Sequence, residues 1–273
     1  MSYDALLTEA EFARFTPNAE VVRYLELTRQ RLGLDKSRMN VLDWGSGRGE
    51  YVAWLRAAGY NAFGAEIRRE AAERGKDLIR SRGHDYDRLI RPIAPDCRTD
   101  LPAGFFHFVF THYVLEHVAD IDAVAREIAR VTAPGGCGFH VYPGKLRPIE
   151  PHLFMPLVHW LPKRPIRKWA IRSCLACGIE PRWEWLAAAS AASKAQAYYE
   201  FCNNETFYRP FRKVRHSFNR VGLEVTPVAA DHPALRPLRI VPSTLRKFFV
   251  ELPVMLFQTV EILVRKQSRE DMA

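Results

Sequence analysis

Residues 41–49 read Val-Leu-Asp-Trp-Gly-Ser-Gly-Arg-Gly, so a short apolar run leads directly into three glycines. The run from Met39 to Asp43 predicts a buried strand, and a helix is expected over Tyr51–Ala58. A glycine turn between a strand and a helix lets the backbone approach a ligand without interference from Cβ atoms. This stretch therefore predicts a site for a nucleoside cofactor.

Alternation of strand and helix continues to residue 141. We expect strands at Ala62–Glu66, Leu89–Ile93, Phe105–Phe110 and Gly138–Val141, helices at 68–82 and Asp122–Val131, and a turn at Pro134–Gly136. Such alternation predicts an α/β fold, with helices on both faces of a parallel sheet. After residue 141 the pattern changes to helical patches (187–201 and 211–221), followed by strands at Leu223–Pro227 and 256–265.

These patterns divide the chain into four parts. We expect an N-terminal helical segment at 1–38, a cofactor-binding α/β core at 39–141, a cap or substrate insert at 142–216 and a C-terminal completion of the sheet at 217–273. The net charge of +9 is unevenly spread, with 19 Lys and Arg against 20 Asp and Glu in residues 1–141, and 21 against 11 in residues 142–273. The second half is therefore either a solvated basic surface or a surface for an anionic acceptor, a membrane or RNA.

The cysteines and the chain start constrain the compartment. Five cysteines form no pattern typical of a secreted disulfide framework. Cys174 and Cys177 have zinc-ligand spacing, but no second pair follows, and no metal site is predicted. No secretory signal is visible, and the apolar run 245–264 carries charges and Pro253, so we expect a cytoplasmic protein.

Acidic residues follow the first three predicted strands. Asp43 stands directly before the glycines, and Glu66 ends the second strand, where a carboxylate can accept hydrogen bonds from ribose hydroxyls. Asp96 follows the third strand, close to where an adenine amino group would need an acceptor. Either of the last two acids could instead be solvated. Asp43 would repel a pyrophosphate, so the loop favours a cofactor with a cationic amino acid end over a dinucleotide.

At this point the residues resemble a known family. Residues 41–49 resemble the first motif of class I S-adenosylmethionine-dependent methyltransferases, and the resemblance extends to the small-molecule and glycan type found in bacteria. Residues 105–118 are similar to the family's fourth-strand signature, and residues 126–136 to the helix and turn that follow it. The resemblance implies a Rossmann-like, seven-stranded, mostly parallel sheet whose last strand is antiparallel, with a helical cap insert.

The family also implies roles for matched positions, with S-adenosylmethionine as cofactor. Gly45, Ser46, Gly47 and Gly49 would pass under its amino acid end, and Asp43 would orient that turn and the methionine amino group. Glu66 would hold the ribose, with Ile67 beside it, and Asp96 or Cys97 would border the adenine. His112, just after the fourth strand, would lie beside the methionine portion or the methyl group.

The acceptor is predicted less directly. His112 is the candidate general base, although it could equally be a structural or cofactor-contacting histidine. His152 or Tyr142 could line the acceptor site. We expect methyl transfer to a small-molecule, lipid-linked or glycan acceptor at oxygen, with peripheral membrane contact as an option. The alternatives are an RNA or protein methyltransferase and a non-catalytic binding protein. Thr111-His-Tyr-Val114 argues against base methylation, which makes nucleic acid an unfavoured partner, and the oligomeric state stays open.

Overall fold

A seven-stranded sheet forms the centre of the computed structural model, which describes residues 5–181, 183–228 and 259–267. The strand order is β3-β2-β1-β4-β5-β7-β6, and β7 runs antiparallel to both of its neighbours. The strands are β1 (Asn40–Trp44), β2 (Asn61–Glu66), β3 (Ile90–Pro92), β4 (Phe106–His112), β5 (Thr132–Pro143), β6 (Leu223–Pro227) and β7 (Thr259–Lys266). The predicted mostly parallel, Rossmann-like sheet is therefore confirmed, including its antiparallel last strand.

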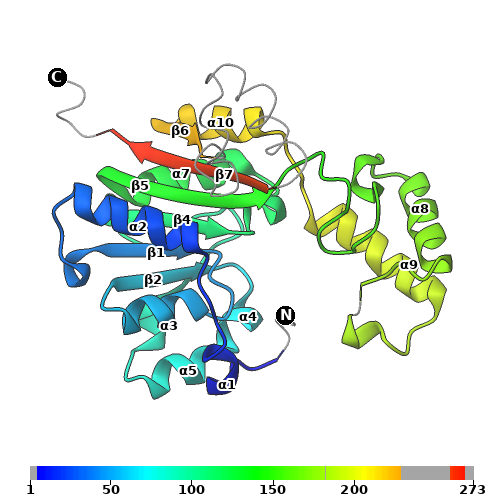
Figure 1. Ribbon diagram of the computed structural model, residues 1–273, viewed down its shortest axis with the longest axis horizontal. Helices are drawn as coiled ribbons and strands as arrows, with labels where there is room; N and C mark the ends of the chain where they lie inside the picture. The colour runs from blue at the N-terminus through cyan, green and yellow to red at the C-terminus, as the bar shows by residue number, and fades with distance from the viewer. Residues whose placement is uncertain (1–4, 182, 229–258, 268–273) are drawn as a thin grey trace, which may run out of the picture.

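Helices cover both faces of this sheet (Figure 1). On one face α2 (Ala19–Arg31), α3 (Glu50–Ala57) and α5 (Lys76–Ser81) contribute apolar side chains to a common core. On the other face α7 (Ile121–Val131) and α10 (Phe211–Asn219) do the same. The shorter helices are α1 (Glu9–Phe12), α4 (Arg69–Glu73), α6 (Tyr86–Leu89), η1 (Lys36–Arg38) and η2 (Leu115–His117).

The long helix predicted over 68–82 is wrong, because the chain forms α4 and α5 with a break at Gly75. A Cβ atom added to Gly75 would lie 1.6 Å from the carbonyl oxygen of Arg48, in the glycine loop. The chain at Gly75 thus packs against the backbone of the loop, and no larger residue fits there. This contact joins segments that are distant in sequence, so a local pattern does not reveal it.

The turn predicted at Pro134–Gly136 is also wrong, because these residues belong to β5. The pairing of β5 with β4 shifts register here, since Phe106 pairs with Thr132 but Phe108 pairs with Cys137. The proline and glycines therefore form an irregularity within a strand.

The insert between β5 and β6 contains two longer helices, α8 (Pro165–Ala176) and α9 (Ala191–Glu200), which stand beside the sheet (Figure 1). The rest of it includes η3 (Val158–Trp160), η4 (Glu184–Leu186) and η5 (Phe201–Glu205). It has an apolar core of its own, built from Leu153, Met155, Val158, Ile171, Leu186, Ala195, Tyr198 and Cys202. Helix α10 packs on α7 and spans position 216, where the sequence placed the end of the insert.

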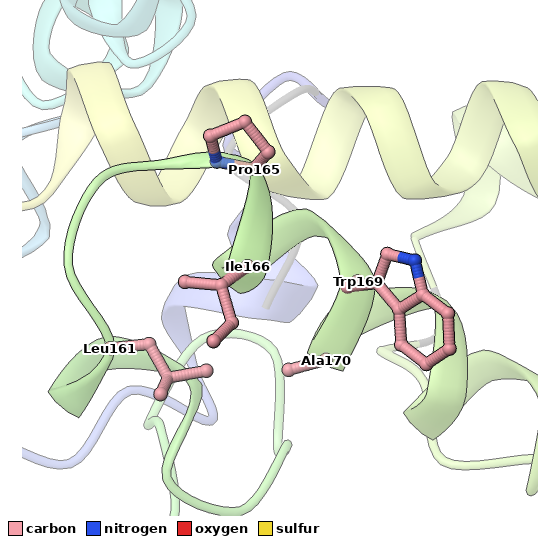
Figure 2. A pocket seen from close by; sticks show the side chains of 5 residues that line it. All are labelled: Leu161, Pro165, Ile166, Trp169 and Ala170. Carbon is pink, nitrogen blue, oxygen red and sulfur yellow. The ribbon is translucent and has the colours of Figure 1, made fainter.

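Large apolar side chains are exposed to solvent on the outer face of α8. Figure 2 shows a shallow depression on this face, lined by Leu161, Pro165, Ile166, Trp169 and Ala170. Trp169 is 72% exposed and Ile166 is 56% exposed. Every helix in the described ranges is too short or too polar to cross a bilayer, and residues 245–258 of the apolar run lie outside those ranges.

Candidate cofactor site

The glycine loop turns sharply at the carboxyl end of β1. Gly45 has a φ of 84°, a left-handed conformation that favours glycine, and its amide donates to the carbonyl of Ala65 at 2.7 Å. A Cβ on Gly45 would lie 2.5 Å from a methyl group of Val114, which follows β4. The loop is therefore enclosed between the ends of β2 and β4, with α3 starting directly after it.

Two predicted carboxylates meet at this loop. Glu66 is 7% exposed and accepts hydrogen bonds from the amides of Gly47 at 2.7 Å and Arg68 at 2.8 Å. Asp43 is 3% exposed, and burial, with Glu66 and Glu50 nearby, raises the pKa of its carboxyl well above the usual range. Asp43 accepts no hydrogen bond from the side chains that the structure describes. A positively charged ligand would relieve this concentration of negative charge.

Ser46 is a buried polar residue of the glycine loop. Its hydroxyl is buried and has no hydrogen-bond partner within the described residues. A Cβ on Gly64, in β2, would come within 2.6 Å of that oxygen. Ile67, directly after Glu66, is largely exposed and so leaves an apolar side chain available at the edge of the site.

The predicted adenine border is a tight turn after β3. Cys97 is half-buried with a φ of 66°, and its amide donates to the carbonyl of Ala94 at 2.8 Å. Asp96 is exposed and accepts from the amide of Arg98 at 3.1 Å, so one of its oxygens stabilises the turn itself. Asp96 therefore has a structural contact that the sequence did not predict.

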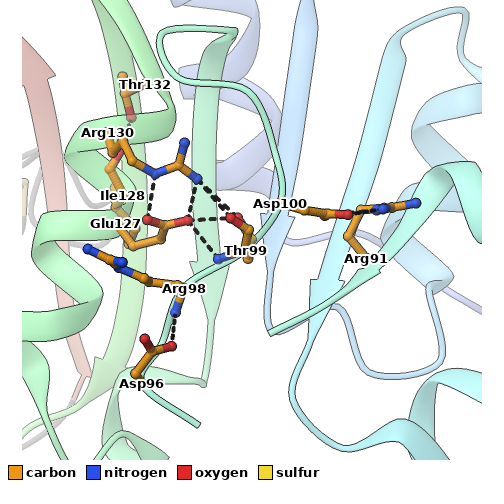
Figure 3. Close-up of polar contacts among 9 residues, drawn as sticks. All are labelled: Arg91, Asp96, Arg98, Thr99, Asp100, Glu127, Ile128, Arg130 and Thr132. Carbon is orange, nitrogen blue, oxygen red and sulfur yellow. Dashed lines mark hydrogen bonds and ion pairs between the residues drawn. The ribbon is translucent and has the colours of Figure 1, made fainter. Parts of the chain in front are cut away.

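A buried carboxylate anchors the chain that carries this turn (Figure 3). Glu127, in α7, accepts hydrogen bonds from the amide of Thr99 at 2.9 Å and its hydroxyl at 2.7 Å. Arg130 donates to the same carboxylate at 2.7 Å. Glu127 was missed in the sequence because its partner lies 28 residues away, on a segment without regular structure.

His112 lies at the end of β4, where the sequence placed it. Its ring makes edge contacts with Tyr51, at a centroid distance of 5.7 Å, and with Tyr113, at 4.7 Å. Burial lowers the pKa of His112 to about 4. The imidazole is thus neutral at pH 7 and can accept a proton, but only as a weak base. His140, by contrast, is fully buried and shares a hydrogen bond with Thr111.

The segment after β4 is held by the insert. Arg209 donates to the carbonyls of Leu115 at 3.2 Å and Ala119 at 2.6 Å, and the amide of Phe207 donates to the carbonyl of Glu116 at 2.6 Å. Burial raises the pKa of the Glu116 carboxyl to about 8. The sequence indicated Glu116 only as part of a family signature, not as a buried acid.

His152 and Tyr142, which were predicted as candidates to line the acceptor site, lie in different parts of the structure. His152 lies in the insert, with its ring 4.9 Å from that of His117, which follows β4. Tyr142 is buried in β5, where its hydroxyl has no hydrogen-bond partner in the described part of the chain and burial raises its pKa. Of these two side chains, His152 is the one that lies between the sheet and the insert.

The sequence of this chain is similar to those of known methyltransferases. A profile described as a methyltransferase domain matches residues 18–227. Methyltransferase GfsG of Streptomyces halstedii is 34% identical over 115 residues, which make up 42% of this chain and 41% of that protein. The match thus spans about two fifths of the length of this curated relative.

Two solved structures are similar to this chain to different degrees. A geranyl diphosphate methyltransferase in complex with GPP and sinefungin has a TM-score of 0.50 and 17% identity, covering 90% of this chain and 77% of that one. A phosphoethanolamine N-methyltransferase 2 of Haemonchus contortus, in complex with S-adenosyl-L-methionine, has a TM-score of 0.49 and 12% identity, covering 90% and 53%. At 17% identity, the likeness to the geranyl diphosphate methyltransferase shows a common fold and no more.

The Glu127 anchor generates the first prediction. Glu127→Ala leaves the amide and hydroxyl of Thr99 without their acceptor, so the free energy of unfolding at pH 7 should fall by about 1.5–3 kcal/mol. Urea unfolding measures it. Asp100→Ala is the control, because its ion pair with Arg91 is solvent-exposed and contributes at most about 1 kcal/mol. An equal loss of unfolding free energy in the two variants would contradict the proposed role of Glu127 in holding Thr99.

The pH dependence of this loss has a defined sign. Burial alone would raise the pKa of Glu127, but hydrogen bonds from Arg130 and Thr99 outweigh it and lower the pKa below 4.5. The stabilisation is therefore present above pH 4.5 and is lost as the pH falls through the lower pKa of the folded state. The difference in the free energy of unfolding between wild type and Glu127→Ala should therefore become smaller as the pH falls below 4.5.

Proposed function

Because the chain belongs to the methyltransferase-domain family, we propose that it transfers the methyl group of S-adenosylmethionine to a small-molecule acceptor, at oxygen. The observation that carries the proposal is the pair of buried carboxylates, Asp43 and Glu66, at the glycine loop. A dinucleotide would bring a pyrophosphate to a site that already carries negative charge. The non-catalytic alternative is disfavoured, because these residues retain the chemistry that a cationic cofactor needs.

The residues of the loop fit this cofactor. Asp43 would bind the ammonium group of the amino acid end, and Glu66 would accept hydrogen bonds from the ribose hydroxyls. The buried hydroxyl of Ser46 supplies a further polar atom without a partner in the described chain. Ile67 and Cys97 would border the adenine, with Asp96 at its edge. The cofactor supplies a methyl group that is already activated, so the protein mainly has to orient the acceptor and exclude water.

His112 would lie beside the methyl-bearing end of the cofactor. With a pKa of about 4, it is a poor base for an ordinary alcohol, whose proton is held far more tightly. We therefore assign His112 first to cofactor contact and second to proton acceptance. An acceptor hydroxyl would need another source of acidification.

The acceptor is proposed to be lipid-linked, because the insert has an apolar outer face. Trp169 and Ile166 are exposed on α8, and two exposed arginines accompany them, Arg164 just before the helix and Arg172 within it. Aromatic and apolar side chains among cations are typical of protein surfaces that rest on anionic bilayers. This arrangement would bring the insert close to an acceptor held in a membrane.

Binding of S-adenosylhomocysteine tests the cofactor assignment. Glu66→Ala should weaken binding by about 1–3 kcal/mol, or roughly 5- to 150-fold, because two ribose hydrogen bonds and the contact to Gly47 are lost. Isothermal titration calorimetry measures the affinity. Glu70→Ala, an exposed acid in α4, is the matched control and should bind as wild type does. Wild-type protein that is folded but does not bind would refute the proposal.

Cosedimentation with vesicles tests the lipid-linked acceptor. The double substitution Ile166→Ala and Trp169→Ala should reduce binding to phosphatidylglycerol-containing vesicles at least about tenfold, since each apolar side chain contributes about 1.5–3 kcal/mol when buried. Leu6→Ala is the control, because Leu6 is 60% exposed but lies in the N-terminal segment. Unchanged binding of the double variant, or no binding by wild type, would rule out this surface.

A further inference from the structure

A second polar cluster lies where the segment after β4 meets the insert. It consists of Glu116 and His117 from η2 and His152 from the insert. One donor atom from each of the three side chains lies within 4.8 Å of the others. Two imidazoles and a carboxylate at this spacing can act as ligands for a single cation.

Glu116 is the first observation that points to a ligand. It is only 2% exposed, and neither of its carboxylate oxygens has a hydrogen-bond partner within the described residues. A buried carboxylate without a partner is costly, and such groups are normally paired or bound to a metal. The carboxylate belongs to the cluster, so a cation bound there would satisfy it.

The histidines are the second observation, because hydrogen bonds fix which ring nitrogen is free. Nδ1 of His117 lies 2.6 Å from the carbonyl oxygen of Glu205, which can only accept, so Nδ1 carries the proton. Nδ1 of His152 lies 2.9 Å from the hydroxyl oxygen of Tyr208 and 3.1 Å from a carboxylate oxygen of Glu150. Because the Tyr208 hydroxyl donates its own proton to that carboxylate, Nδ1 of His152 must donate rather than accept. Both rings therefore keep Nε2 as the nitrogen with a lone pair.

This is the arrangement that orients histidines on metals, where one nitrogen binds the ion and the other donates to a carbonyl or carboxylate. Glu150 is fully buried and also accepts from the backbone amides of His152, at 2.7 Å, and Leu153. Its position is thus fixed before any ion binds. The charges of Glu116 and Glu150 together would balance those of a divalent cation.

We propose that Glu116, His117 and His152 bind a divalent transition-metal ion, with Zn²⁺ as the reference case. Two histidines and one glutamate make up a donor set of zinc sites that leave a further position open for water or substrate. Glu150 and Tyr208 are positioning residues that act through His152.

The ion would lie near the cofactor loop. Val114 packs against Gly45, and the three steps along the chain from Val114 to His117 span at most about 11 Å. On the premise of the proposed function, the ion would bind the acceptor hydroxyl and lower its pKa. The O–H bond would then break with the electron pair left on the oxygen, and the proton would leave to solvent. This supplies the acidification that His112 does not.

Zinc binding by the full chain tests the proposal. After removal of metal with a chelator, wild type should bind one Zn²⁺ in calorimetry, and Zn²⁺ should raise its melting temperature. His117→Ala and His152→Ala should each weaken binding at least 100-fold, and Glu150→Gln should weaken it 10- to 100-fold. The reference protein and every variant carry Cys174→Ser and Cys177→Ser, so that this thiol pair binds no zinc in any sample.

His216→Ala, an exposed histidine in α10, is the matched control and should bind as wild type does. Zinc affinity that is equal in wild type and His117→Ala, or no binding by wild type, would overturn the metal site. S-adenosylhomocysteine binding is measured on the same metal-free samples. Its presence without zinc binding refutes the metal site alone, and its absence with zinc binding refutes the cofactor assignment alone.

Discussion

The hydrogen bond from the Gly47 amide to the Glu66 carboxylate joins the two strand ends on which the cofactor site depends. It holds the loop after β1 against the end of β2, at the edge where the parallel strands finish. The loop fits there only because Gly64 and Gly75 lack side chains that would collide with Ser46 and Arg48. The loop therefore packs directly on the backbone of Gly64 and Gly75, and the carboxyl groups of Asp43 and Glu66 lie close together beside it.

The segment after β4 connects this loop to the insert. Val114 packs against the loop, and two residues later Glu116 receives a hydrogen bond from the backbone of Phe207. Arg209 then binds the carbonyl of Leu115, in η2, and that of Ala119, which follows η2. A shift of this segment would move both the wall of the loop and the polar cluster. The proposed cofactor and acceptor sides are thus linked by one short stretch of chain.

Most of the sheet could be predicted from local patterns. Leu223–Pro227 was predicted with the bounds that β6 has, and the strand after Gly59 and the helix after Gly49 begin within one residue of the expected positions. The predicted helix over 68–82 and the predicted turn at Pro134–Gly136 were wrong, because the role of a glycine in each depends on distant parts of the chain. Gly75 lies between α4 and α5, where only a residue without a Cβ leaves room for the carbonyl of Arg48. Gly135 lies in a strand because residues on either side of it, Thr132 and Cys137, pair with β4.

The sequence by itself determined the order of strands and helices, the glycine loop and the acids at the strand ends, because these depend on residues close together in the chain. Only the tertiary structure decided which polar groups meet. Glu127 holds Thr99 across 28 residues, and His152 faces His117 across 35, so neither pair follows from any local period. The burial of Glu116, which has no side-chain partner among the described residues, likewise exists only once the insert packs on the segment after β4, because desolvation is a property of the packed chain.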